Sequence, residues 1–368
     1  MKNLSVLVLC CIVLFSCKKD KIDFDEDLVS SVETFASNGG RCDWSVTTNK
    51  IVYDAEIDDH WDIIISNPDK TGQFNLTEDM SNQVIEGQMI ESWHYRGQPA
   101  FDKSGQYILF QVHNEHASSS HPSEEHLSLG VNQDLWYMTA DGSIKQKLTD
   151  NSAGMSVLHP KFSHDGTKIM WAEKYSENEN ASIFGAWRIR IADVSIDAND
   201  SIQVLASNTY QPCGEKWYET HAFSDDDQGI YFSCNYETDF KASDLFKYDL
   251  NTQTLTNITN NPTEWEEMYN PNPANPNEYS FISSRFFDWN NSLGWATLRT
   301  ELYLNTNGEI KQLTYYNQLR KKNGKRLTKE HYFIGDHCWA PDGKSILAIL
   351  ASAKIGSTNT TLLKINLN

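Results

Sequence analysis

The chain has 368 residues, of which 39% are hydrophobic and 12% aromatic, so it is long and apolar enough to bury a core and is not an intrinsically disordered chain. It carries 31 basic and 50 acidic side chains. This excess of negative charge argues against binding to nucleic acid, because phosphate contacts need a positive surface.

The N-terminal segment is expected to lie outside the fold. Lys2 is followed by an apolar run, Leu4 to Phe15, that is too short to span a bilayer, so residues 1–16 are predicted to be a signal peptide. Leu14-Phe15-Ser16-Cys17 resembles the lipobox of bacterial lipoproteins, which implies cleavage before Cys17 and lipidation of its thiol. Residues 17–27 would then be a tether. The alternative is an ordinary signal peptide with an incidental cysteine.

A short motif recurs after the tether: an aromatic residue, a polar turn that often contains Asp-Gly, and a second apolar strand, which together indicate a β-hairpin. Its clearest copy spans residues 159–172. The aromatic positions are Trp44, Phe101, Phe162, Phe223 and Trp339, at intervals of 57, 61, 61 and 116 residues. The last interval is of double length, which predicts a degenerate copy over residues 269–282 with Asn272 at the aromatic position. The chain therefore contains six units.

Each unit continues with a third and a fourth strand. Third strands are predicted at residues 62–65, 134–138, 187–191, 244–248 and 300–304, and the fourth strand of four units ends in Leu-Thr or Ile-Thr, at Thr77, Thr149, Thr259 and Thr314. Four short antiparallel strands per repeat, repeated six times, predict an all-β, six-bladed β-propeller.

The sixth unit is incomplete, because the chain ends with its third strand, Thr361–Leu367. An unpaired strand edge in a ring invites aggregation. Leu28–Phe35 is a strand that belongs to no unit, and we expect it to be the missing fourth strand of the last blade.

The aromatic-Ser-x-Asp-Gly repeat and the Leu-Thr strand resemble the TolB-like six-bladed β-propellers over residues 28–368. This resemblance implies a central channel lined by the first strand of every blade, with ligands bound at its mouth. It says little about activity, because the scaffold hosts periplasmic binding proteins, protease accessory domains and some polysaccharide lyases.

Polar residues precede the aromatic position in most units, where they are expected to face the channel. Candidate ligand-binding residues here are Arg41, Gln98, Tyr269 and Asp336. His159, His221 and His337 fall in the same part of the unit and suggest a Mn or Zn site, which resembles the His-rich Mn site of oligogalacturonate lyases. The alternative is that these histidines line a wet channel and bind backbone or water.

Three loops that enter blades pair a carboxylate with an indole: Glu91-Ser92-Trp93, Glu215-Lys216-Trp217 and Glu264-Trp265. Such pairs suit stacking on a sugar, a cation or a peptide, so Trp93, Trp217, Trp265 and the neighbouring Glu219 are candidate ligand-binding residues. Packing of the tryptophans between blades is the alternative. The His-rich loop over residues 113–126 could bind metal but is expected to be a solvated loop.

Four cysteines follow Cys17, and an exported chain could pair them as Cys213–Cys234 and Cys42–Cys338. The first pair flanks one hairpin and the second lies at the seam of the ring. Four buried thiols are the alternative.

The sequence therefore predicts a lipid-anchored envelope protein, on the periplasmic face of the outer membrane or the cell surface, that acts as a monomeric binding module for an envelope protein or a glycan. It would contact the membrane through its anchor only and would not bind nucleic acid. The alternative is an enzyme, a metal-assisted oligouronate lyase or hydrolase. A purely structural part of an envelope complex is a third interpretation.

Overall fold

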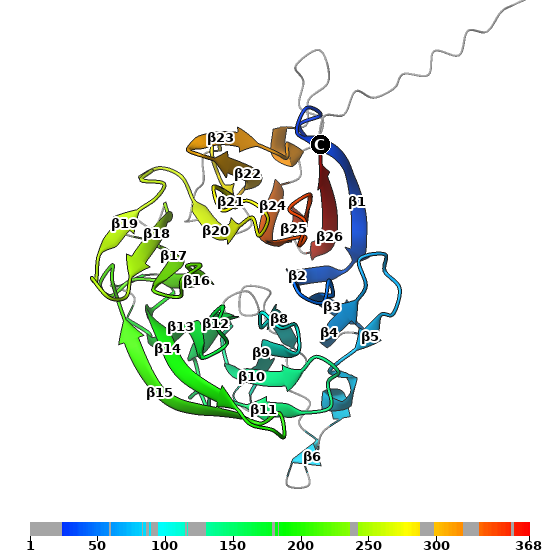
Figure 1. Ribbon diagram of the computed structural model, residues 1–368, viewed down its shortest axis with the longest axis vertical. Helices are drawn as coiled ribbons and strands as arrows, with labels where there is room; N and C mark the ends of the chain where they lie inside the picture. The colour runs from blue at the N-terminus through cyan, green and yellow to red at the C-terminus, as the bar shows by residue number, and fades with distance from the viewer. Residues whose placement is uncertain are drawn as a thin grey trace, which may run out of the picture.

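Six antiparallel sheets of four strands surround a central axis, so the predicted six-bladed β-propeller is confirmed (Figure 1). The computed structural model describes residues 24–368 except 59, 83, 86–87, 90–94, 115, 117–129, 179–180, 183, 236–241, 288–297, 319–330 and 355–356. The expected signal peptide, Cys17 and most of the tether lie outside the described residues. Within the described part of the chain, no helix is long and apolar enough to cross a membrane.

Blades 1 to 5 each use four strands in chain order, with the first strand nearest the axis (Figure 1). Blade 1 consists of β2 (Gly39–Trp44), β3 (Ile51–Ile57), β4 (His60–Ser66) and β5 (Phe74–Asn75). Blade 2 consists of β8 (Arg96–Phe101), β9 (Tyr107–His113), β10 (Gln133–Thr139) and β11 (Lys145–Lys147). Blade 3 consists of β12 (Ser156–Phe162), β13 (Lys168–Ser176), β14 (Ala186–Ile196) and β15 (Ile202–Tyr210).

The remaining blades complete the ring. Blade 4 consists of β16 (Tyr218–Phe223), β17 (Gly229–Cys234), β18 (Asp244–Asp249) and β19 (Leu255–Asn257). Blade 5 consists of β20 (Glu266–Pro271), β21 (Glu278–Ser283), β22 (Glu301–Thr306) and β23 (Glu309–Gln312). Blade 6 consists of β24 (His331–Trp339), β25 (Ser345–Lys354), β26 (Ser357–Leu367) and β1 (Val29–Ser37). A small hairpin, β6 (Val84–Ile85) with β7 (Gln88–Met89), and the 3₁₀ helices η1 (Glu78–Asn82) and η4 (Tyr316–Gln318) lie between blades in the chain.

The two ends of the chain close the ring, as predicted. β1 pairs with β26 from Val29 opposite Leu367 to Ser37 opposite Thr361, and the two strands run side by side at the outer edge of blade 6 (Figure 1). The backbone N–H of Asn368 also donates to the carbonyl of Leu28 at 2.9 Å. The outer edge of β26 is therefore covered by the N-terminal strand.

The recurring Leu-Thr has a structural explanation. In four blades the threonine hydroxyl donates to the acid near the start of the third strand: Thr77 to Asp62 at 2.8 Å, Thr149 to Asp134 at 3.1 Å, Thr259 to Asp244 at 2.9 Å and Thr314 to Glu301 at 2.6 Å. The same hydroxyl accepts the N–H of the residue after that acid, at 2.9–3.0 Å. Each pair satisfies buried polar groups where the fourth strand ends. We call these four pairs the acid–threonine latches.

Apolar packing lies between neighbouring blades. One buried cluster joins blades 3 and 4 through residues such as Met170 and Phe232, and another joins blades 5 and 6 through residues such as Ile282 and Ile346. Because the hydrophobic side chains fill the spaces between sheets, the channel at the axis is left to polar side chains.

In blade 5 the predicted aromatic position is wrong by one residue. Glu267 lies opposite Ile282 as Leu158 lies opposite Ala172 in blade 3, so Pro271 and not Asn272 stands at the aromatic position. Met268, and not Tyr269, is then equivalent to His159. Asn272 instead starts the turn, where its side-chain oxygen accepts the N–H of Ala274 at 2.9 Å.

Candidate functional site

Every strand that lines the channel is interrupted by a β-bulge near its middle. The residues left out of the ladders are Gly40–Arg41, Gln98–Pro99, His159–Pro160, His221, Met268–Tyr269 and Gly335–Asp336. Gln98, His159 and Met268 take the left-handed backbone conformation, with φ of 52°, 48° and 63°. Bulges re-aim side chains, and here they bring polar groups of different blades toward one axis.

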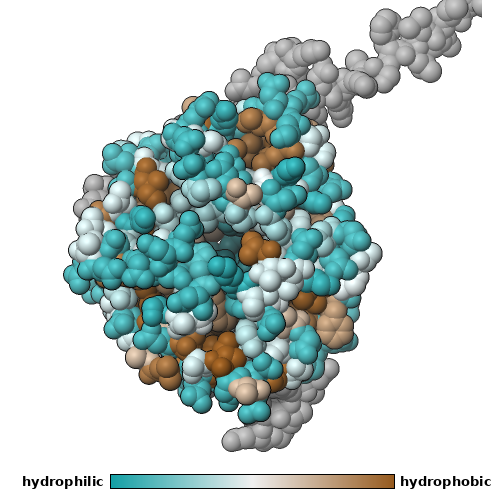
Figure 2. Space-filling model, in the orientation of Figure 1, coloured by the Kyte–Doolittle hydropathy of each residue, from teal (hydrophilic) through white to brown (hydrophobic). Residues whose placement is uncertain are grey.

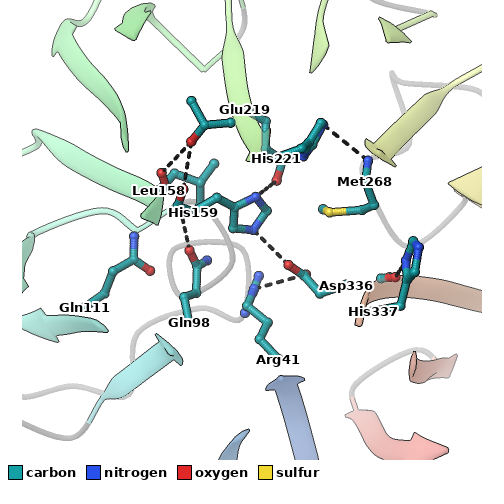
Figure 3. A network of polar contacts seen from close by, with 12 residues as sticks. Arg41, Gln98, Gln111, Leu158, His159, Glu219, His221, Met268, Asp336 and His337 are labelled. Atoms are coloured by element: carbon teal, nitrogen blue, oxygen red, sulfur yellow. Dashed lines mark hydrogen bonds and ion pairs between the residues drawn. The ribbon is translucent and has the colours of Figure 1, made fainter. Parts of the chain in front are cut away.

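His159 lies at the centre of the resulting network, between two carboxylates from other blades (Figure 3). Its Nδ1 lies 3.0 Å from Oε1 of Glu219, and its Nε2 lies 3.0 Å from Oδ1 of Asp336. The other oxygen of Asp336 lies 3.2 Å from Nε of Arg41. The order Arg41–Asp336–His159–Glu219 thus crosses the channel through blades 1, 6, 3 and 4.

The backbone of the bulges is held by the same network. The backbone N–H of Arg41 and that of Gln98 donate to the two carboxylate oxygens of Asp54, at 2.7 Å and 2.8 Å. The side-chain oxygen of Gln98 accepts the N–H of His159 at 2.8 Å. Gly40 makes room for this arrangement, because a Cβ at that position would collide with the Asp54 carboxylate.

The charges of the central groups follow from these contacts. Burial alone lowers the pKa of His159, but Asp336 and Glu219 outweigh it and raise the value to about 9. Burial raises the pKa of Asp336, yet His159 and Arg41 together hold it below its usual range. At neutral pH the network therefore contains an imidazolium paired with two carboxylates, with the Arg41 guanidinium beside one of them.

Glu267 of blade 5 extends the network on the side of Glu219. Burial and the neighbouring Glu219 raise the pKa of Glu267 well above its usual range. Two neighbouring carboxyl groups in a buried site disfavour each other's ionised form. With Gln98 from blade 2, all six blades contribute to one network.

The three histidines do not form the predicted metal site. Both ring nitrogens of His159 bind carboxylates. Nε2 of His221 lies 2.6 Å from Ser233 Oγ and accepts the N–H of Met268 at 3.2 Å, and Nε2 of His337 lies 2.7 Å from Ser280 Oγ. Among the described residues, no group of three or more His, Cys, Asp or Glu side chains is placed to hold a metal ion. In this structure the imidazoles contact carboxylates, serine hydroxyls and one backbone N–H.

A cavity lies beside the network, and a hollow is visible near the centre of the mainly hydrophilic face in Figure 2. Its volume is about 40 Å³, roughly the space of three water molecules. The candidate residues Arg41, Gln98, Tyr269 and Asp336 line it together with the three histidines. The other lining residues sit at the bulges or just after them: Cys42, Pro99, Pro160, Lys161, Thr220, Met268 and Asn270.

Two of the three indole candidates, Trp217 and Trp265, are buried away from the mouth of the channel. Trp217 and Trp265 are 2% and 0% exposed and their rings lie 5.4 Å apart within the apolar cluster of blades 3 and 4. Their expected role in ligand stacking is therefore wrong, and packing between blades describes them. Trp93 and most of the His-rich loop lie outside the described residues. Glu219, predicted with the tryptophans, belongs to the central network.

One of the two expected cysteine pairs is a disulfide and the other is not. Cys213 and Cys234 form a disulfide that joins the start of blade 4 to the end of its second strand. Cys42 and Cys338 are buried free thiols whose sulfur atoms lie 3.3 Å apart, between blades 1 and 6. The expected covalent bridge between them is therefore not present in the structure.

Sequence reasoning missed Asp54, Glu267 and Lys161. Asp54 carried a signal, because it interrupts the apolar run Ile51-Val52-Tyr53 in a strand that a propeller buries on both faces. The sequence signal for Glu267 was weaker: it is an acidic residue close to the expected channel position. Neither pattern states which groups of other blades lie opposite.

Comparisons with known proteins agree with the fold. No protein-family model and no curated protein matches the chain. A solved structure assigned as TolB from Agrobacterium tumefaciens is 11% identical, with a TM-score of 0.50, over 86% of this chain and 90% of that one. TolB from Acinetobacter baumannii is 10% identical, with a TM-score of 0.49, over 87% of this chain but only 65% of its own length. An oligogalacturonate lyase in complex with manganese is 12% identical, with a TM-score of 0.49, over 95% and 98% of the two chains.

The structure thus defines a six-bladed propeller whose channel is crossed by a network of buried charges. Its fold is that of the TolB-like propellers. At these identities the likeness concerns the fold alone, so activity has to be argued from the site.

Proposed function

We propose that the protein is an exported, lipid-anchored propeller that acts as a binding module and takes a protein segment or a glycan at its channel. The observation that carries this proposal is the convergence of side chains from all six blades on one cavity. Buried charge networks contribute little net stability, because desolvation offsets the attraction between the charges. Ionisable groups with strongly shifted pKa values in a cavity are typical of functional sites.

The proposal can be tested by crosslinking in intact cells. Tyr269 lines the cavity and is only partly buried, so a photo-reactive phenylalanine in its place replaces one aromatic residue of the cavity lining by another. Phe74, 58% exposed on the outer strand β5, provides the matched control. We expect a defined protein or glycan adduct from position 269 and none from position 74. The same adducts from both positions, or none from 269 in folded protein, would refute the binding module.

The lipid anchor rests on the sequence alone and has a separate test. Replacing Cys17 by Ala should abolish incorporation of a labelled fatty acid and release the protein from the membrane fraction. Cys11→Ala, within the expected signal peptide, should leave both unchanged. Retention of the label in Cys17→Ala would rule out lipidation at this thiol.

A metal-assisted oligouronate lyase remains the alternative. It would require His159, His221 and His337 to exchange their present protein contacts for a metal ion. Formation of unsaturated products from polygalacturonate, dependent on added Mn²⁺ and lost in His337→Ala, would establish this activity in place of simple binding.

A further inference from the structure

The cavity lacks the excess of negative charge that the whole chain carries. Four charged side chains line it: Arg41, His159, Lys161 and Asp336. Three of them are cationic at neutral pH, since the imidazole of His159 is doubly protonated between its two carboxylates. Glu219, Glu267 and Asp54 belong to the network but do not line the cavity. Asp336, Glu219 and Asp54 balance these three cations, so the site is close to neutral within a chain whose net charge is −19.

Two hydrogen-bond donors at this cavity have no acceptor among the described residues. Gln98 is 3% exposed, and its Nε2 is buried without a hydrogen-bond partner although its Oε1 is bound to the His159 backbone. Lys161 has no ion pair with any side chain that the structure describes. Lys161 is one of the residues that line the cavity. A buried donor without an acceptor, such as the Gln98 amide, lowers stability.

We propose that the channel cavity binds a carboxylate group, either of a small organic acid or as the exposed acid group of a larger ligand. A carboxylate accepts several hydrogen bonds and would satisfy the Gln98 amide and the Lys161 ammonium at once. The volume of about 40 Å³ admits such a group, in place of a few waters, but not a sugar ring or a whole side chain. This inference rests on the proposed function in taking the channel as the binding surface, and it specifies the group that is recognised there.

The test compares small ions of opposite charge. Ligand-observed NMR of the purified protein should detect binding of acetate and none of methylammonium. Lys161→Gln should weaken acetate binding by about tenfold or more. This factor corresponds to the lower end of the range of free energies for a hydrogen bond to a charged group. Lys311→Gln removes the same charge from the outer strand β23 and should have no effect. Equal binding by Lys161→Gln and wild type, preference for methylammonium, or no acetate binding would overturn the proposal.

A second variant keeps the test valid if Lys161→Gln does not fold. Gln98→Glu retains the oxygen that accepts the His159 N–H but replaces the unpartnered amide donor by an acceptor, so it should also lose acetate binding. A Gln98→Glu protein that folds and binds acetate as wild type does would equally refute the site.

Paired ligands identify the source of the carboxylate. Glucuronate against glucose tests a glycan, and acetyl-trialanine as free acid against its amide tests a peptide terminus. The two proposals can be refuted separately. Crosslinks at the channel without acetate binding would refute only the carboxylate-binding cavity. Acetate binding without crosslinks at the channel would refute only the proposal that the protein binds a protein segment or a glycan there.

Discussion

His159 shows how one residue gains its properties from segments far away in the chain. Its ring binds Glu219 and Asp336, which lie 60 and 177 positions further on in the sequence. A histidine, a glutamate and an aspartate at these positions are ordinary when each is taken alone. Together they form a buried imidazolium with two carboxylates, because the bulges of β12 and β24 aim His159 and Asp336 at the point where β16 presents Glu219.

Asp336 is predicted to be the most sensitive member of the network. Asp336→Asn removes the negative charge that faces both Arg41 and His159 and should destabilise the protein by about 3–5 kcal/mol, as breaking a buried ion pair does. Urea unfolding measures the loss. Asp225→Asn, at an exposed turn, is the control and should change stability little. Equal stabilities of the two variants would show that the network adds nothing to the fold.

At the scale of elements, the repeat is held by local devices and the ring by one distant pairing. Four blades carry acid–threonine latches. Blade 3 lacks one, and its fourth strand β15 runs on for 9 residues to Tyr210. The latch therefore marks where a short outer strand stops. Closure depends instead on β1, which is separated from β26 by almost the whole chain.

Removal of β1 should open the ring. A chain that starts at Asn38 leaves the edge of β26 unpaired, and we expect a lower melting temperature and concentration-dependent association, because free edges pair with other chains. A chain that starts at Phe24 retains β1 and should behave as the full-length protein does. Light scattering with thermal melting distinguishes the two. A monomeric, equally stable chain from Asn38 would contradict closure by β1.

The disulfide of blade 4 makes a separate contribution. Cys213 and Cys234 are 21 positions apart, and closing a loop of this length stabilises by about 3 kcal/mol in the chain-entropy model. The Cys213→Ser/Cys234→Ser variant should lose about that much in urea unfolding. In unreduced, denatured protein only Cys42 and Cys338 should react with a thiol reagent. Four reactive thiols in the lipidated chain would contradict the disulfide.

For the whole molecule, buried ionisable groups predict how stability depends on pH. Burial raises the pKa of Asp54 to about 6 and those of Glu266 and Glu301 to about 7. These groups bind more protons in the folded than in the unfolded state, so they lower stability as pH rises from about 4 to 7. Burial lowers the pKa of His337 to about 4, below its unfolded value of 6.5. This group therefore makes stability rise with pH between about 4 and 6.5.

Above pH 6.5 the main contribution is that of His159. Its pKa of about 9 in the folded state exceeds its unfolded value of 6.5, so its stabilisation is complete below pH 6.5 and is lost as pH rises through 9. We expect the melting temperature to fall as pH rises from about 5 to 9, first because of the buried carboxyls and above pH 6.5 because of His159. His159→Gln should be less stable at pH 6 and should show a smaller fall between pH 7 and 9. A melting temperature that rises over that interval would contradict the charged His159.

The sequence by itself determined the number of blades, their strands and the closure by the N-terminal strand, because hairpin turns, alternating apolar residues and latch threonines are encoded within a few neighbouring residues. It also placed Arg41, Gln98, His159 and Asp336 at channel positions. Only the tertiary structure decided that the histidines bind protein groups, that Trp217 and Trp265 are packed between blades, and that Glu267 and Asp54 complete the network. The physical reason is that a local pattern records which side of a strand is buried, whereas the partner of a buried charge depends on what the other blades place across the axis.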